Sequence, residues 1–133
     1  GRDEWKHAEH LLVALYYVDS FGLEEGTRKM REGILNLLTK GFNVDLEKEM
    51  PYHETITVFW VRTVYGFSII NSEMPFAEKA GLMIETFDKD MPLRFYSREQ
   101  LFSEDARARF VDPAESAFYS AWDHIYAHRS TPT

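Results

Sequence analysis

The residues from His53 to Asn71 form the most apolar segment of the chain and restrict its fold most strongly. The run 55–64, TITVFWVRTV, is rich in β-branched and aromatic residues and would suit a strand by propensity. However, the segment extends over about nineteen residues without polar–apolar alternation, and no turn signal precedes Asn71-Ser72. That length exceeds the usual length of a strand, so we predict a buried helix.

Amphipathic patterns predict helices over most of the remaining chain. Glycine, proline and serine residues separate these helices, as expected for C-terminal stops, first-turn positions and N-caps. The predicted helices cover residues 4–20, 23–40 and 75–87, two short stretches after Ser97 and Ser103, and residues 113–128, which a short tail follows. We therefore predict an all-α fold in which residues 1–133 form a single domain, a helical bundle of about four main helices plus short ones.

The composition excludes several classes of protein. The 133 residues contain no cysteine, which excludes disulfides and thiolate metal sites and fits a reducing cytoplasm, the location that we expect. No apolar run reaches the roughly 20 residues of a membrane span, so we expect no membrane partner. Twenty-two acidic and fifteen basic residues give a net charge of −7, so binding of nucleic acid is not expected. The glycines form no phosphate-binding loop, so no nucleotide cofactor is expected.

Three histidines lie on the apolar faces of two predicted helices. His7 and His10 are about 60° apart on a helical wheel and share the apolar stripe of the first helix. By the same count, His53 falls in line with Thr57 and Trp60 on the third helix. Burying an imidazole without partners costs roughly a few kcal/mol. Inward-facing histidines therefore indicate either a functional site or core groups whose hydrogen bonds are satisfied.

The three histidines and Glu54 are candidate metal ligands. Three imidazoles and one carboxylate suit a divalent transition metal such as zinc, iron or copper, so His7, His10, His53 and Glu54 form the predicted metal site. The string from His53 begins like the metalloprotease motif His-Glu-x-x-His, but Thr57 stands where that motif has its second histidine. Zinc-protease chemistry is therefore not expected.

Without a metal, some of the same residues can act as acid and base. His53 near a helix N-terminus stays neutral, and Glu54 beside it stays ionised, which suits a general base. Tyr96 can add a phenol hydroxyl, so His53, Glu54 and Tyr96 are the candidate catalytic residues. The candidate substrate-binding residues are Thr57, Trp60 and Arg94, although Thr57 can also bond to its own helix and Arg94 can be an ordinary surface residue.

Three strings of the chain resemble a family of small bacterial proteins that is generally described as uncharacterised. They stand in the order known for that family: His7-Ala8-Glu9-His10-Leu11, Tyr52-His53-Glu54-Thr55-Ile56-Thr57 and Tyr96-Ser97. The resemblance extends over about residues 5–113. It supports grouping these histidines with Glu54 and Tyr96, but it implies no particular reaction.

Three functions are compatible with these observations. The first is a small metal-dependent or acid–base enzyme that acts on a small polar or aromatic molecule inside the bundle. The second is a non-catalytic domain that binds a small molecule or senses pH through its histidines. The third is an interaction domain that dimerises through exposed aromatic residues. A small-molecule ligand or substrate is thus the expected partner, with a homodimer as a further possibility.

Overall fold

Helices make up all of the regular secondary structure in residues 2–41 and 52–113, which are the residues that the computed structural model describes. The elements are α1 (Arg2–Asn36), η1 (Leu37–Gly41), α2 (Glu54–Ile70), α3 (Phe76–Thr86), η2 (Met91–Arg94), α4 (Arg98–Leu101) and α5 (Glu104–Ala108). The all-α prediction is therefore confirmed, and the long apolar segment is the helix α2. Apart from Pro113, the predicted helix over residues 113–128 lies outside the described residues. Within the described part of the chain, no helix has the length and apolar character of a membrane span.

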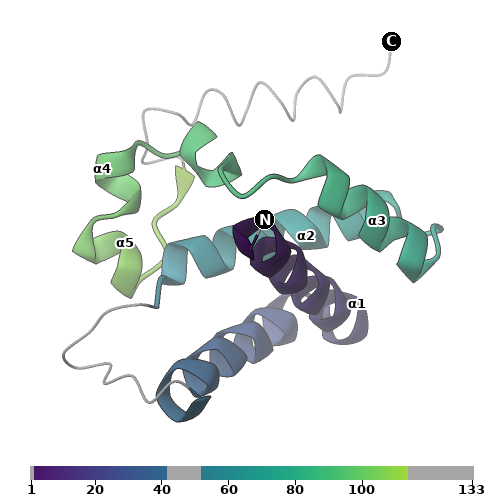
Figure 1. The fold of residues 1–133 in the computed structure, drawn as a ribbon, viewed down its shortest axis with the longest axis horizontal. Coiled ribbons are helices and arrows are strands. Elements are labelled where there is room, and N and C mark those ends of the chain that lie inside the picture. Colours follow the sequence, from purple (N-terminus) through teal and green to yellow (C-terminus); the bar gives the residue numbers. More distant parts are fainter. Residues whose placement is uncertain (1, 42–51, 114–133) are drawn as a thin grey trace.

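The helix α1 is a hairpin of two arms that meet at Gly22 (Figure 1). The backbone of Gly22 has φ 85° and ψ 179°, a conformation that is almost restricted to glycine. Residues 2–21 form the first arm and residues 23–36 the second arm, as predicted from the break at this glycine. Gly26 lets the arms approach closely, because a Cβ there would lie 3.2 Å from the backbone of Tyr17 and Val18.

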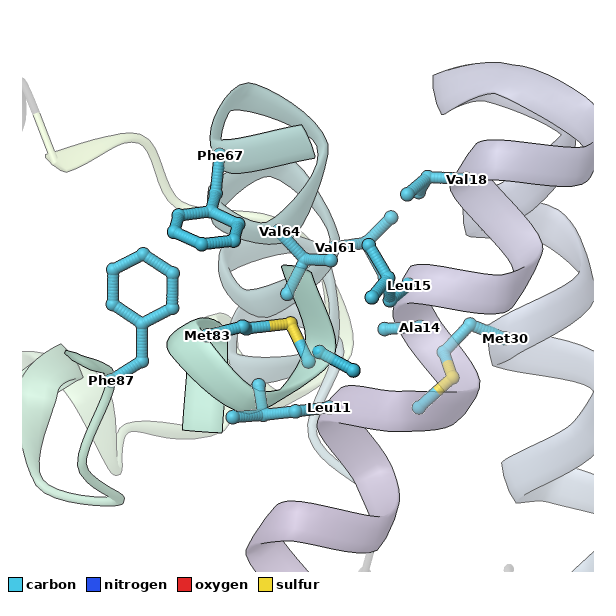
Figure 2. Packing of buried hydrophobic residues seen from close by; sticks show 11 residues of the cluster. Leu11, Ala14, Leu15, Val18, Met30, Val61, Val64, Phe67, Met83 and Phe87 are labelled. Atoms are coloured by element: carbon cyan, nitrogen blue, oxygen red, sulfur yellow. The ribbon is translucent and has the colours of Figure 1, made fainter. Parts of the chain in front are cut away.

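The helix α2 lies at the centre of the fold and contacts α1, α3 and α5 (Figure 1). Figure 2 shows the larger apolar core, to which both arms of α1, the C-terminal half of α2 and the helix α3 contribute. Its buried members are Leu11, Ala14, Leu15, Val18, Met30, Val61, Val64, Phe67, Ala80, Met83 and Phe87. Burial of this β-branched helix on several sides explains why tertiary packing overrides its strand propensity.

A smaller apolar core joins the N-terminal half of α2 to the short helices. Its buried members are Phe59, Phe95, Tyr96, Leu101, Ala106 and Val111. The side chain of Ser97 accepts a hydrogen bond from the backbone of Gln100, and Ser103 accepts one from Ala106. Both predicted serine caps are thus present, and the short helices start where they were expected.

An ion pair between the buried Lys79 and the more exposed Asp19 joins α1, α2 and α3. The Lys79 ammonium on α3 lies 2.9 Å from an Asp19 carboxylate oxygen on α1, and 2.9 Å from the Ser68 hydroxyl on α2. Ser68 in turn donates a hydrogen bond to Asp19. The Lys79 side chain is only 7% exposed, and these two partners satisfy hydrogen bonds that water would otherwise make with the ammonium.

Candidate functional site

A pocket of about 270 Å³ opens between the two arms of α1 and the first turns of α2. Its lining residues are Lys6, His7, His10, Leu11, Met30, Ile34, Ile56, Thr57 and Trp60. Four of them, His7, His10, Thr57 and Trp60, are site residues that the sequence predicted. The polar groups come from the first arm and from Thr57, whereas most other lining side chains are apolar.

The His7 imidazole is held in one orientation. Its Nε2 lies 2.8 Å from the backbone oxygen of Phe87, and because a carbonyl only accepts, Nε2 carries the proton. The ring also meets Trp60 edge-on, with the two ring centroids 4.9 Å apart. His7 thus connects the pocket to the end of α3 and packs against the indole that lines it.

His10 differs from His7 because its imidazole forms no hydrogen bond with another residue in the described ranges 2–41 and 52–113. Partial burial lowers the pKa of His10 below its ordinary value, and this effect outweighs the negative charge of Glu9, which raises it. The ring is therefore a neutral imidazole at neutral pH, with one donor and one acceptor available for a ligand.

His53 does not line this pocket, contrary to the prediction that the three imidazoles converge. Its Nδ1 accepts a hydrogen bond from the backbone of Ile56 and caps the N-terminus of α2, at 3.2 Å. Its Nε2 donates to the backbone oxygen of Leu101, at 2.6 Å. Burial lowers the pKa of His53. Both ring nitrogens are engaged, so the neutral imidazole acts as a structural cap.

Glu54 is held by Arg31 and Tyr52 instead of standing ready as a general base. Arg31 binds both carboxylate oxygens, at 2.8 and 2.6 Å, and the Tyr52 hydroxyl donates to one of them at 2.6 Å. Burial by itself raises the pKa of Glu54, but the hydrogen bonds from Arg31 and Tyr52 outweigh it and lower the pKa. Burial, together with the bond to Glu54, raises the pKa of Tyr52 to about 12.

The remaining candidate residues also have structural partners. Tyr96 is fully buried, and its hydroxyl donates to the backbone oxygen of Val111 at 2.6 Å. Arg94 is exposed and pairs with Asp88, with the two charged groups 2.8 Å apart. Thr57 does line the pocket, while its hydroxyl donates to the backbone oxygen of His53. The sequence-based grouping of Tyr96 and Arg94 with the histidines is therefore not reproduced.

The predicted four-ligand metal centre is not supported by this geometry. Within residues 2–41 and 52–113, no group of three or more histidine, aspartate or glutamate side chains is arranged to hold a metal ion. Two of the four predicted ligands already have partners, since both ring nitrogens of His53 are hydrogen-bonded and the Glu54 carboxylate binds Arg31.

The sequence pattern did not indicate that residues of the second arm of α1 line the pocket. Met30 and Ile34 had the periodicity of ordinary core residues, and only the fold of the hairpin brings them opposite His10. Lys6 lies outside the centre of the apolar stripe and therefore gave no signal. Its position four residues before His10 places both on neighbouring turns of one helix, which is the pattern that could have revealed it.

Comparison of the chain with protein-family models, curated proteins and solved structures finds no match.

Proposed function

We propose that this protein binds a small organic molecule in the pocket between α1 and α2, and that the His10 imidazole exchanges a proton with it. The observation that carries the proposal is the position of the His10 imidazole, which has no hydrogen-bond partner among the described residues, at a pocket with a mostly apolar lining. Ligand sites typically combine an apolar lining with a few polar groups that fix the orientation of the ligand.

The chemistry of the lining supports binding of a partly apolar molecule. Trp60 and Ile34 offer apolar surface, while His10, Lys6 and Thr57 offer polar contacts. A volume of about 270 Å³ lies just below the range of roughly 300–1,000 Å³ that is typical for drug-sized ligands, so the molecule is small.

His10 is the best candidate for acid–base work among the predicted residues. A neutral imidazole can take a proton from a bound molecule and return it, and general acid–base catalysis of this kind contributes about 10²–10⁴-fold in enzymes. The hydrogen bonds of His53, Glu54 and Tyr96 leave those groups occupied. The proposed activity is therefore acid–base chemistry without a metal, carried by a single histidine.

Two-dimensional ¹H–¹⁵N NMR of the tag-free protein tests the binding step. The probes are indole, benzyl alcohol, benzamide and benzoate, each added to millimolar concentration. We expect shifts of the Trp60 indole N–H and of the backbone signals of Leu11 and Ile34. The control variant Ile34→Trp fills the pocket and should lose these shifts while keeping a native spectrum.

The proton step is tested through His10 itself. A bound probe whose polar group contacts His10 should move the pKa of its ring, which the ring ¹³C–¹H signals follow between about pH 5 and 8. The variant His10→Gln should keep the fold, because the His10 side chain is only partly buried and has no hydrogen-bond partner among the described residues. If no probe shifts pocket signals, or if Ile34→Trp binds as well as the parent protein, the proposal is wrong.

A further inference from the structure

We infer that the pocket takes a small organic carboxylate, whose negative head group binds between Lys6 and His10 and whose aliphatic or aromatic tail lies against Trp60. This inference rests on the proposed function and specifies the chemical class of the ligand. It follows from the distribution of charge and apolar surface around the pocket.

Positive charge at the pocket comes from Lys6. Lys6 lines the pocket and forms no ion pair with any residue of the described ranges. Among the lining residues of ranges 2–41 and 52–113, none is an aspartate or a glutamate. Glu9 lies close enough to His10 to raise its pKa, but it is not among the residues that line the pocket. The described polar groups that an anion meets at the lining are therefore the Lys6 ammonium, the two imidazoles and the Thr57 hydroxyl.

The opposite part of the pocket is apolar. Leu11, Met30, Ile34, Ile56 and Trp60 supply a lining that suits a hydrocarbon chain or an aromatic ring. An ionised head group binds best where it meets charge-assisted donors, and a tail binds best where it displaces water from apolar surface. A carboxylic acid with a short tail satisfies both parts, whereas a highly charged or fully polar molecule leaves the apolar lining unused.

The state of His10 makes binding depend on pH. The imidazole is neutral in the free protein, because burial lowers its pKa. A carboxylate beside it favours the protonated form, so binding takes up a proton and tightens as the pH falls from about 8 to 5.5. The titratable neighbours on its own helix are Lys6, His7 and Glu9. The lining residues from the second arm and α2 carry no titratable group.

The experiment compares matched probes that differ in charge. Benzoate and benzamide have nearly the same shape, as do hexanoate and hexanamide. Affinities come from NMR titration at pH 6, and calorimetry in two buffers of different ionisation enthalpy measures proton uptake. We expect the carboxylates to bind about tenfold more tightly than the amides, as is typical of one charge-assisted contact. We also expect benzoate, and not benzamide, to raise the pKa of His10.

Two lysine variants separate a pocket contact from a general charge effect. Lys6→Met should weaken benzoate binding about three- to fivefold, since the lysine is exposed, and should leave benzamide unchanged. The control Lys40→Met removes an exposed lysine from η1 and should change neither. Equal binding of acid and amide, or an equal effect of Lys6→Met on both, would overturn the inference while the proposed function stands. If no probe binds, both are wrong.

Discussion

Replacing Asp19 with asparagine tests how strongly the buried ion pair stabilises the packing of α1 against α3. Asparagine keeps the shape of the side chain and can still accept the hydrogen bond from Ser68. It removes the negative charge and leaves the Lys79 ammonium, 7% exposed, with the Ser68 hydroxyl as its remaining partner at 2.9 Å.

The structure predicts unequal costs for the two halves of this pair. Removing one partner of a buried pair costs roughly 3–5 kcal/mol, and Asp19→Asn should lie near 3 kcal/mol because some water reaches this site. Lys79→Met leaves an Asp19 carboxylate that is 26% exposed and still bound by Ser68, so its cost should be about 1 kcal/mol. The double variant should be less destabilised than the sum of the two single variants, by about 1–2 kcal/mol.

Urea denaturation at 25 °C, followed by circular dichroism, measures these three free energies of unfolding. An unchanged dependence on urea concentration would show that each variant unfolds from the same compact state. A cost of less than about 1 kcal/mol for Asp19→Asn, or equal costs of the two single variants, would contradict this prediction. In either case the ammonium would be solvated in solution.

Further predictions concern the cap, the hairpin and the buried phenol. His53→Ala should lower the free energy of unfolding by about 2 kcal/mol and His53→Asn by about 1 kcal/mol, because asparagine can still cap α2. Since burial lowers the pKa of His53, the unfolded chain takes up a proton first, and stability should fall as the pH drops below about 6.5. His53→Asn should flatten this slope in urea titrations at several pH values. Gly22→Ala should destabilise the protein by about 1–3 kcal/mol, because Gly22 has a positive φ. Gly81→Ala, in an open position of α3, should stabilise it by up to about 1 kcal/mol. The melting temperatures of the two variants should therefore move in opposite directions. Tyr96→Phe should cost about 1 kcal/mol and leave benzoate binding unchanged in NMR titration.

The helices could be predicted from the sequence because their limits depend on neighbouring residues. The hairpin turn needs a glycine at position 22, and the two short helices need the hydroxyls of Ser97 and Ser103. These signals act over a few residues, so a pattern in the sequence is enough to find them. The helical state of α2 followed from its length, which outweighed a composition that favours strands.

The site could be predicted only in part, because the role of each site residue depends on contacts with residues far away in the sequence. His53 and Leu101 are 48 positions apart, and His7 and Phe87 are 80 positions apart. No local pattern shows which backbone oxygen an imidazole will meet. The partners Arg31 and Glu54 likewise come from different helices, and each one alone looks like an ordinary surface charge.

Helix ends explain why the three histidines have different roles. The last carbonyl groups of a helix lack partners within it, and an imidazole N–H can satisfy one of them. His7 donates to the residue that caps the C-terminus of α3, and His53 donates to the last residue of α4. His10 meets no such carbonyl among the described residues. Two histidines on apolar stripes therefore serve the fold, and the third retains a ring whose hydrogen bonds a ligand can complete.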